Sequence, residues 1–416
     1  MTCARREIFG RVFLSVSCAC FTENITIIPF FVLLPCRKCG ERCNFAAILK
    51  TMKTMWFVLF FVLPFVGLAY VLWHVWCLLP LSAGWRWAVV GVGLAAFLTL
   101  FLNFSRAIDG LPLNLASACY EVGNSSIFIL LYLVIAFLLL DLGRLLHIVP
   151  RSWLYSNCIV STVLFAVVAL VFIAGNIHYN NKVRHTIQLT TDKHLGRPVK
   201  VVMMSDLHLG YHNRSKELAR WVDMINAEHA DLILIAGDMI DISMRPLIEE
   251  NMASELRRLN APVYACLGNH EYYSGEPQAQ KFFADAGITL LRDSMACVGQ
   301  LCIIGRDDRS RLHRRSVAEL MRSADKSRYT ILLDHQPYHL DRSERAGVDF
   351  QLSGHTHRGL LWPISWITDR IYECSYGPWQ RGNTQYYVSS GLGIWGGKFR
   401  IGTCSEYVVA TITGRK

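Results

Sequence analysis

Charged side chains are scarce in the N-terminal part of this 416-residue sequence. Four apolar stretches, residues 55–79, 87–104, 125–146 and 153–177, contain very few of them. Each is near the ~20 residues that a helix needs to cross a bilayer, although the second is at the short end. With 52% hydrophobic residues and a positive mean hydropathy, the chain is too apolar for an ordinary soluble enzyme. The sequence therefore predicts an all-α transmembrane region of about four helices at residues 55–178.

The flanks of these stretches also indicate a multi-pass integral membrane protein. The alternative interpretation is a buried helical core in a soluble protein. The connections between the stretches are short, however, so such a protein would have few residues with which to cover four apolar helices. Aromatic residues gather near the ends, as in a membrane-interface belt: Trp56, Trp73, Trp76, Trp85, Trp87, Trp153 and Tyr155. The positions of Lys and Arg near the ends favour, by a small margin, both termini and the C-terminal part on the cytoplasmic side.

The first 54 residues give no clear structural signal. The moderately apolar stretch 11–35 is interrupted by Glu23 and Asn24 and has no small-residue cleavage site. It is either a partly inserted fifth segment or upstream translation, because Met52 and Met55 precede an apolar run as a natural start would. We therefore treat 1–54 as an uncertain leader and leave open whether residues 1–51 belong to the native protein.

The cysteines give little support for a disulfide-stabilised protein or a zinc finger. The 14 cysteines show no repeating spacing, which indicates buried thiols rather than a disulfide framework. The cluster at residues 36–43 resembles half a zinc site, but no second ligand pair follows at finger spacing.

The only basic block in the hydrophilic part is 309–315, so no nucleic-acid partner is expected. We interpret this block as a solvated loop, with a contact to anionic substrate or lipid headgroups as the alternative.

Potential metal ligands follow apolar runs in the C-terminal part. The runs are short and rich in β-branched or aliphatic residues, as buried strands are: 199–204, 232–235, 263–267, 330–333 and 350–352. The side chains that follow are Asp206, His208, Asp238, Asp241, Asn269, His270, His335, His355 and His357. In open α/β sheets the ligand crevice lies outside the carboxyl ends of the strands, so these side chains are expected to converge.

The types of these side chains indicate a two-metal hydrolytic centre. Carboxylate and amide oxygens suit hard divalent ions, and imidazole adds affinity for Mn, Fe, Zn or Co. Asp206 and His208 would lie in an extended segment and point to one side, with Leu207 toward the core. The two oxygens of Asp238 can bridge two ions, and two ions ~3.5–4 Å apart can support an in-line displacement at phosphorus. A bridging hydroxide is the natural nucleophile.

The elements around these runs complete an α/β domain at residues 198–416, after a linker at 179–197. Two amphipathic helices are expected, one presenting Leu218 and Ile225 and the other running from Leu247 through Ile248 to Leu259. Three histidines outside the motifs are expected at the surface: His212, His313 and His339. Glu271 is expected to be a structural hydrogen-bonding partner rather than a ligand.

As an ordered set, the motifs resemble the calcineurin-like metallophosphoesterase superfamily. Ser390 to Gly393, Arg400 to Gly402 and Glu406 narrow the resemblance to its membrane-associated branch of predicted phosphohydrolases. It covers approximately residues 198–413 and implies a sandwich of two mixed β-sheets flanked by helices. The transmembrane region lies outside the resemblance.

The resemblance also implies roles for the site residues. One metal would be held by Asp206, His208, Asp238 and His357, and the other by Asp238, Asn269, His335 and His355. His270 would stabilise the phosphoryl oxygens or protonate the leaving group, and Asp241 would orient His270. The family usually has Arg after this Asp, where this chain has Ile242, which puts a phosphate contact at that position in doubt.

These expectations combine into a membrane-anchored, metal-dependent phosphoesterase. Two divalent ions are implied, Mn first, with Fe, Zn, Ni or Co as alternatives. The substrate is a phosphomonoester, phosphodiester or pyrophosphate, and sharing a membrane favours a lipid-linked one without proving it. The alternative is a membrane sensor or scaffold whose domain binds metal without turnover, although such a domain would be expected to lose ligands. The physiological substrate and the oligomeric state stay open.

Overall fold

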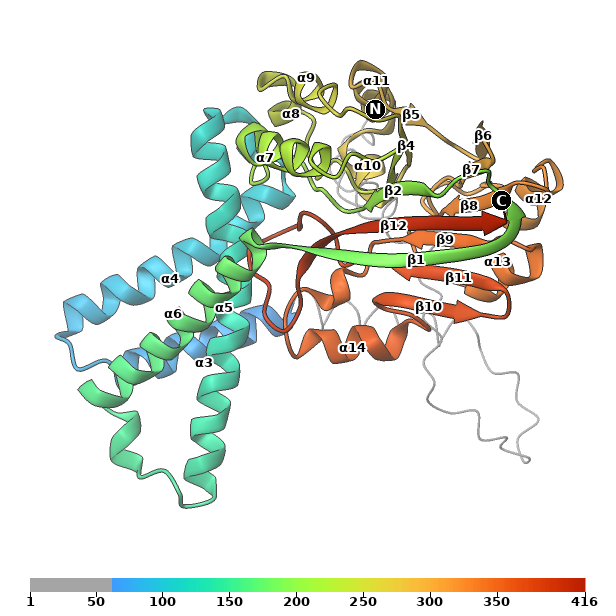
Figure 1. Ribbon diagram of the computed structural model, residues 1–416. Coiled ribbons are helices and arrows are strands. Elements are labelled where there is room, and N and C mark those ends of the chain that lie inside the picture. Colours follow the sequence, from blue (N-terminus) through green and yellow to red (C-terminus); the bar gives the residue numbers. More distant parts are fainter. Residues whose placement is uncertain (1–61, 416) are drawn as a thin grey trace, which may run out of the picture.

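Two six-stranded mixed sheets form the C-terminal part of the chain in the computed structural model, which describes residues 62–415 (Figure 1). The first sheet has the order β1-β12-β2-β3-β4-β5 and the second β10-β11-β9-β8-β7-β6. In the first sheet only the β12–β2 pair is antiparallel. In the second sheet β10 and β6 run antiparallel to the four parallel strands between them. The strands are β1 (Lys182–His194), β2 (Val199–Met204), β3 (Leu232–Ala236), β4 (Val263–Cys266), β5 (Thr289–Leu290), β6 (Ser294–Val298), β7 (Leu301–Gly305), β8 (Tyr329–Leu333), β9 (Phe350–Ser353), β10 (Gly377–Arg381), β11 (Thr384–Val388) and β12 (Ser405–Arg415).

Helices cover the outer faces of the sheets, and the core lies between the sheets. In β2, Val201 and Met203 join a buried cluster that includes Phe350 of the second sheet. Their neighbours Val202 and Met204 belong to another buried cluster, formed with the helices, because side chains alternate between the two faces of a strand. The helices of this part are α7 (Ser215–Asn226), α8 (Arg245–Glu249), α9 (Met252–Leu256), α10 (Asn269–Ser274), α11 (Glu276–Asp285), α12 (Val317–Arg322), α13 (Leu340–Ala346), η4 (His357–Gly359) and α14 (Ile364–Ile371). The predicted sandwich of two mixed sheets flanked by helices is confirmed.

Two segments differ from the sequence-based expectation. The predicted linker at 179–197 contains β1, a 13-residue edge strand that pairs in parallel with β12 from Lys182 to His194. The single helix expected from Leu247 to Leu259 is divided into α8 and α9. Asn251 between them has a φ of 48°, which interrupts the helix. Ile248 consequently lies on the surface, 67% exposed, instead of in the core.

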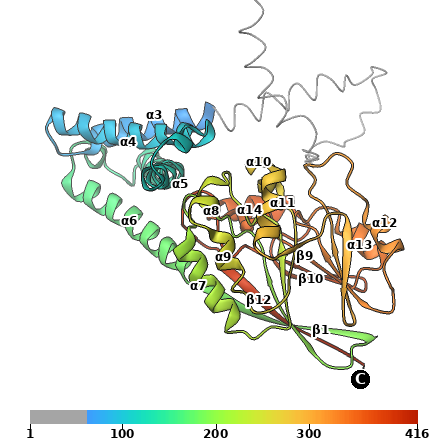
Figure 2. The same ribbon diagram turned by 90° about the horizontal axis from the view of Figure 1, so that it is seen from above.

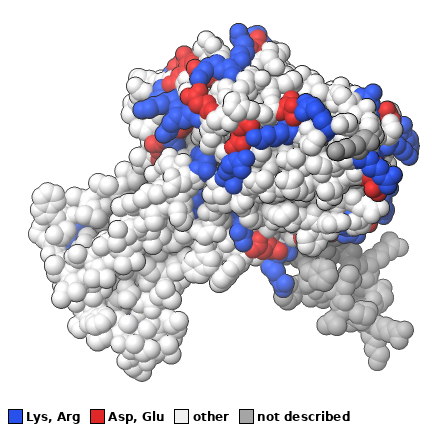
Figure 3. Space-filling view, in the orientation of Figure 1, with Lys and Arg blue, Asp and Glu red and all other residues white. Residues whose placement is uncertain are grey.

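Four apolar helices precede the sheets in the described chain. They are α3 (Leu63–Leu78), α4 (Ala83–Phe104), α5 (Leu113–Leu145) and α6 (Cys158–Asn180), with the short helices η2 (Ala107–Gly110) and η3 (Arg151–Leu154) in the connections. By length and composition α4, α5 and α6 can cross a membrane, whereas α3 has 16 described residues. Figure 3 shows this helical part almost free of charged side chains, in contrast to the charged surface of the two-sheet part.

Helix α5 is longer than the predicted stretch 125–146 at its N-terminal end. Its 33 residues make a helix about 50 Å long, whereas the hydrocarbon core of a bilayer is about 30 Å thick. The segment from Leu113 to Asn124 therefore extends the helix beyond the predicted span. This extension packs against the two-sheet part, with Tyr120 buried at 3% exposure.

Several predictions fall outside the described residues. These are the leader at 1–54, its apolar stretch at 11–35, the cysteine cluster at 36–43 and the start of the first apolar stretch at 55–61. The described part of that first stretch is α3.

The helical part is joined closely to the two-sheet part (Figure 2). Phe128 of α5 and Phe172 of α6 share a buried cluster with Ile394 from the loop before β12. The backbone N–H of Arg400 donates to the carbonyl of Gly175 in α6 at 2.9 Å. A β-carbon at Gly175 would lie 2.9 Å from a side-chain carbon of Ile401 in the same loop, so this close contact requires glycine.

Candidate metal centre

The nine predicted site residues all follow the carboxyl ends of strands, but the strands belong to two sheets. Strands β2, β3 and β4 belong to the first sheet, and strands β8 and β9 belong to the second. They are Asp206 and His208 after β2, Asp238 and Asp241 after β3, Asn269 and His270 after β4, His335 after β8, and His355 and His357 after β9. The side chains therefore converge where the carboxyl ends of both sets of strands meet.

Most of the candidate ligands occupy left-handed backbone conformations. Such conformations cost roughly 1–3 kcal/mol each in a residue other than glycine, and they collect at functional sites. The φ angles are 53° for Asp206, 45° for His208, 49° for Asp238, 69° for His355 and 46° for His357. The expectation of an extended segment from Asp206 to His208 is wrong in this respect. Leu207 is nevertheless buried, as expected, and the two side chains do point to the same space.

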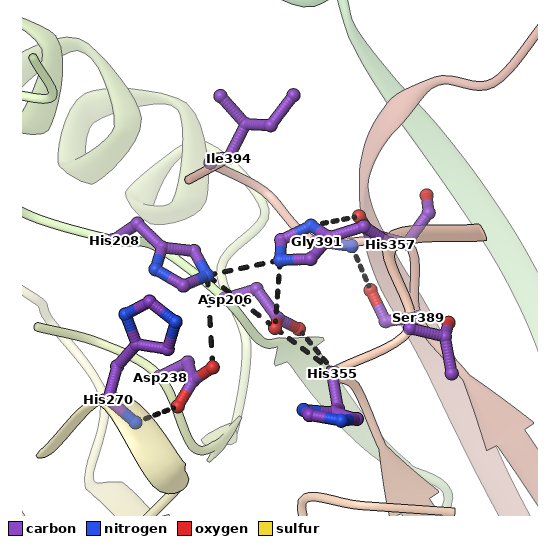
Figure 4. Close-up of polar contacts among 12 residues, drawn as sticks. Asp206, His208, Asp238, His270, His355, His357, Ser389, Gly391 and Ile394 are labelled. Carbon is purple, nitrogen blue, oxygen red and sulfur yellow. Dashed lines mark hydrogen bonds and ion pairs between the residues drawn. The ribbon is translucent and has the colours of Figure 1, made fainter. Parts of the chain in front are cut away.

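One cluster of ligand atoms is formed by Asp206, His208 and His357 (Figure 4). The Nε2 atoms of His208 and His357 lie 3.0 Å apart. Asp206 Oδ1 lies 3.3 Å from Nε2 of His357 and 3.8 Å from Nε2 of His208. All three side chains are fully or almost fully buried, so their ligand atoms face one small enclosed space.

A second cluster contains Asp238, His335 and His355, whose ligand atoms all lie within 4.8 Å of one another. Nε2 of His335 is 3.0 Å from Oδ2 of Asp238. Nδ1 of His335 contacts the carbonyl oxygen of Ala236 at 2.7 Å, which fixes the ring and leaves Nε2 toward the aspartate.

Asp238 lies between the two clusters. The same oxygen, Oδ2, is 3.0 Å from Nε2 of His335 in the second cluster and 3.8 Å from Nε2 of His208 in the first. Its other oxygen, Oδ1, accepts a hydrogen bond from the backbone N–H of His270 at 2.9 Å. This is the position that a carboxylate bridging two ions would occupy.

The residues present fit two divalent ions. Buried polar atoms normally have hydrogen-bond partners, yet Oδ1 of Asn269 has none among the described residues. The backbone also approaches the carboxylates closely. A β-carbon at Gly268 would be 2.1 Å from Oδ1 of Asp238, and one at Gly354 would be 2.1 Å from Oδ2 of Asp206. Carboxylate, amide and imidazole donors around two adjacent spaces form a ligand set for Mn, Fe, Zn or similar ions.

The protonation states partly match a metal site. Burial acts to raise the pKa of Asp238, but His335 nearby holds it well below its usual range, so the carboxylate is ionised. Burial lowers the pKa of His355 to about 4, so this ring is a neutral donor. Burial also acts to lower the pKa of His208, but hydrogen bonds with Asp206 and a second site aspartate raise it to about 10. A metal ion would have to displace the proton of His208.

His270 and Asp241 lie beside the first cluster. Nδ1 of His270 is 3.2 Å from Oδ1 of Asp241, and Nδ1 of His208 is 3.3 Å from the same oxygen. The His270 side chain keeps 14% exposure, whereas Asp241 and His208 are buried. A histidine that is held by a carboxylate and open on one side is placed to exchange a proton with a substrate.

Comparison with known proteins identifies the family. The model of the calcineurin-like phosphoesterase family matches residues 199–359. A metallophosphoesterase of Aquifex aeolicus is 33% identical over 230 residues, which cover 53% of this chain and 87% of the relative. The chain belongs to the calcineurin-like phosphoesterase family. This membership supports a metal-dependent phosphoester hydrolase.

Other relatives are longer than the matched part. A Campylobacter jejuni metallophosphoesterase is 30% identical over 53% of this chain, and the chain spans 61% of it. A Danio rerio transmembrane protein with a metallophosphoesterase domain is 29% identical over 50% of this chain, and the chain spans 52% of it. Together with α4, α5 and α6, this relative supports a membrane protein.

Solved structures also resemble the chain. A 5'-nucleotidase precursor of Thermus thermophilus matches with 17% identity and a TM-score of 0.32, covering 48% of this chain and 49% of that one. A dimetal phosphatase of Danio rerio matches with 12% identity and a TM-score of 0.32, covering 47% and 88%.

The structure adds a residue that the sequence did not indicate at the phosphoesterase site. The hydroxyl of Tyr120, from the extension of α5, donates to Oδ2 of Asp241 at 2.6 Å. Its ring stacks on His212 with centroids 4.9 Å apart. The expectation that His212 lies at the surface is therefore wrong, because it is 1% exposed under Tyr120. No local motif marks Tyr120, which lies about 120 residues from Asp241 in the sequence.

Ile242 also belongs to this contact. It replaces the usual family Arg and packs beside a buried cluster that contains Ile108, Tyr120 and Tyr211. An apolar side chain at this position therefore serves the contact between the helical part and the phosphoesterase domain, which gives a structural reason for the departure.

Two other features hold the loops of the domain. Glu271 accepts hydrogen bonds from the backbone N–H groups of Asp238, Ile240 and Gly268, so its expected structural role is confirmed. Arg400 is buried and donates to the carbonyl oxygens of His357, Ser390 and Gly393. These bonds fix the backbone that carries His357.

The basic block at 309–315 contains fixed side chains. Arg311 is 2.9 Å from Asp307, and Arg314 is 2.9 Å from Asp334. Both guanidinium groups thus have carboxylate partners, which argues against a role for these two residues in holding an anionic ligand.

Proposed function

We propose that this protein is a membrane-anchored phosphoesterase that uses two divalent ions, Mn or a similar metal, to hydrolyse a phosphomonoester, phosphodiester or pyrophosphate. The observation that carries the proposal is the position of Asp238, with one oxygen near His335 of one cluster and near His208 of the other. A carboxylate shared in this way suits two ions rather than one. Asp206, His208, Asp238 and His357 would hold the first ion, and Asp238, Asn269, His335 and His355 the second.

Besides the metal ligands, His270 and Asp241 would take part in the reaction. When bound, the two ions supply Lewis-acid activation of water and of the phosphoryl oxygens. His270 would donate a proton to the leaving oxygen or a hydrogen bond to the phosphoryl group, since its ring is the most open of the site histidines near Asp241. Asp241 would hold that ring in place through the 3.2 Å contact at Nδ1.

The proposed membrane anchoring rests on α4, α5 and α6, which are long and apolar enough to span. The domain would face the cytoplasm, because Lys182 and Arg184 follow α6 directly. A reporter attached to the C-terminus tests this orientation. A substrate carried by the same membrane is favoured, because enzyme and substrate would then share one surface.

Hydrolysis of bis-p-nitrophenyl phosphate by the full-length protein in detergent tests the activity. We expect turnover with Mn, loss of turnover with EDTA and recovery when Mn is returned. Asp238→Asn should lose turnover, because a neutral amide is a poor bridging ligand. Asp285→Asn, a change of the same type at an exposed aspartate of α11, should not.

Inactivity of the folded protein with Mn, Zn, Fe, Ni and Co would contradict the proposal. It would favour the alternative of a sensor or scaffold that binds metal without turnover. The complete set of candidate ligands argues against that alternative, because a domain without catalysis has no need to keep both clusters.

A further inference from the structure

Helix α14 has its apolar side turned outward. Its buried residues are polar, Ser365 and Thr368, whereas Trp366 is 63% exposed and Ile367 is 60% exposed. Ile371 at its end is 43% exposed, and the charged side chains of Asp369 and Arg370 are exposed beside it. In a helix on the surface of a soluble domain the apolar side faces the core and the polar side faces water. The reversed arrangement of α14 therefore indicates that something apolar covers its outer side.

The outer side of α14 adjoins the helical part. The carbonyl of Trp362, just before α14, accepts a hydrogen bond from the hydroxyl of Tyr132 in α5 at 2.6 Å. The ring of Trp362 is itself 41% exposed and packs edge to face against Trp366 with centroids 5.4 Å apart. Beyond Tyr132, α5 exposes apolar side chains such as Leu139, at 63%. The segment that leads into α14 is thus held against α5, a helix able to cross a membrane, and Figure 1 shows α14 beside the helical part.

The position of Tyr132 along α5 matches the depth at which an interfacial helix lies in a bilayer. Tyr132 lies seven residues beyond the start of the predicted span 125–146, which corresponds to about 10 Å of helix. Interfacial helices lie with their apolar side about 5–10 Å into the boundary between headgroups and acyl chains. Tryptophan is the residue type that such boundaries favour, and α14 and the segment just before it present two, Trp366 and Trp362.

The same helix is connected to the candidate metal centre. It follows η4, which begins at His357, and the link between them is tight: a β-carbon at Gly359 would lie 2.6 Å from Thr368. After α14, the ring of Tyr372 has its centroid 6.5 Å from that of His355. A surface that fixes α14 therefore also fixes the position of the metal centre relative to that surface.

We propose that the outer side of α14, formed by Trp362, Trp366, Ile367 and Ile371, is a membrane-contact surface that lies in the headgroup boundary of the bilayer crossed by α5. The substrate class that this arrangement serves is a phosphate ester carried on a lipid. The site is then presented to headgroups at the membrane surface instead of to solutes in the bulk. The substrate class rests on the proposed phosphoesterase function, whereas the contact with lipid does not.

Photolabelling tests the contact. The full-length protein is placed in phosphatidylcholine vesicles that contain a phospholipid with a photoactivatable group near the headgroup, and labelled peptides are identified by mass spectrometry. We expect label on the peptide that contains residues 362–371, with peptides of α6 as the positive control and those of α8 as the negative control. The double variant Trp366→Ser/Ile367→Ser should lower the label at 362–371 at least about fivefold, because the buried apolar area is lost.

A pair of matched variants tests the substrate class. Ile367→Ser and Ile248→Ser each replace an exposed helical isoleucine, at 60% and 67% exposure, but Ile248 lies on α8, which Figure 1 shows far from α14. Ile367→Ser should lower turnover of phosphatidic acid in vesicles. The double variant Trp366→Ser/Ile367→Ser should lower it further, by about tenfold. In both of these variants, turnover of bis-p-nitrophenyl phosphate should stay within about twofold of the unmodified protein. Ile248→Ser should stay within about twofold on both substrates.

The outcomes separate the two proposals. Label on α6 without label at 362–371 overturns the membrane contact, whatever the activity. Label at 362–371 with equal effects of the double variant on both substrates overturns the role in presenting lipid-borne phosphate. Absence of bis-p-nitrophenyl phosphate turnover in the unmodified protein instead contradicts the phosphoesterase function and leaves the labelling result to decide the contact alone.

Discussion

Asp241 joins two histidines of the candidate site to a tyrosine from the helical part. One of its oxygens contacts His208 and His270, and the other accepts the hydrogen bond of Tyr120. Asp241 therefore connects the His270 ring to α5, because this buried carboxylate is itself held by the hydroxyl of Tyr120.

Replacement of His270 tests its role as proton donor. We expect His270→Ala to keep its metal content, because all the proposed metal ligands remain, and to lower turnover of bis-p-nitrophenyl phosphate by roughly 10²–10⁴. Metal content by mass spectrometry and steady-state kinetics measure the two effects. His194→Ala, at an exposed position in β1, is the matched control. Unchanged turnover in His270→Ala would remove this residue from the mechanism.

Removal of one oxygen atom tests the contribution of Tyr120. We expect Tyr120→Phe to lower kcat about five- to tenfold, because a hydrogen bond to the buried carboxylate is worth roughly 1 kcal/mol or slightly more. KM should change little, because Tyr120 contacts Asp241 and acts through the position of His270. Tyr132→Phe removes a hydroxyl from the same helix without touching Asp241. Equal kcat values for Tyr120→Phe and the unmodified protein would show that the bond has no effect on the site.

At the scale of elements, β1 is the part that the sequence failed to indicate. Only Leu189 of its 13 residues is buried, and its partner β12 lies more than 200 residues away, so neither an apolar run nor proximity in the chain identifies it. The strands β2, β3, β4, β8 and β9 were predictable because each is a short, mainly apolar run that is followed closely by a candidate ligand. Tyr120 was not, because a single tyrosine carries no spacing signal and its contact with Asp241 depends on how two distant segments pack.

The attachment of β1 should depend on Glu228. Arg184 of β1 holds this carboxylate through two contacts of 2.7 and 2.9 Å, and Tyr407 of β12 donates to it at 2.9 Å. Hydrogen bonding by Arg184 lowers the pKa of Glu228 to about 2. A lowered folded-state pKa gives stability that is present above the unfolded value of 4.5 and is lost as the pH falls toward 2.

We therefore expect Glu228→Gln to lower the unfolding midpoint by roughly 2 °C at pH 7, and the difference to shrink below about pH 4.5. Thermal scans at several pH values measure it. Glu255→Gln removes an exposed ion pair with Arg258 and should change the midpoint little at any pH. A difference that grows as the pH falls would contradict the assigned role of Glu228.

At the scale of the whole molecule, the structure argues against a phosphoesterase domain that works independently of the helices before it. Tyr120 reaches Asp241 from α5, Gly175 of α6 binds the loop of Arg400, and β1 continues directly from α6 into the first sheet. The predicted boundary at residue 198 would remove β1 and leave the edge of β12 unpaired. Exposed strand edges of this kind promote association with other chains.

Two fragments and the full-length protein test this integration. A fragment of residues 198–416 should aggregate, because β12 loses the strand that pairs with it from Ser405 to Arg415. A fragment of residues 181–416 keeps both sheets, and in detergent it should hydrolyse bis-p-nitrophenyl phosphate with kcat lowered about five- to tenfold, the effect of losing the Tyr120 hydroxyl. Size-exclusion chromatography and kinetics distinguish the three proteins. Full activity of the 181–416 fragment would mean that the helices only anchor the site, whereas a deficit equal to that of full-length Tyr120→Phe would show that α5 completes it.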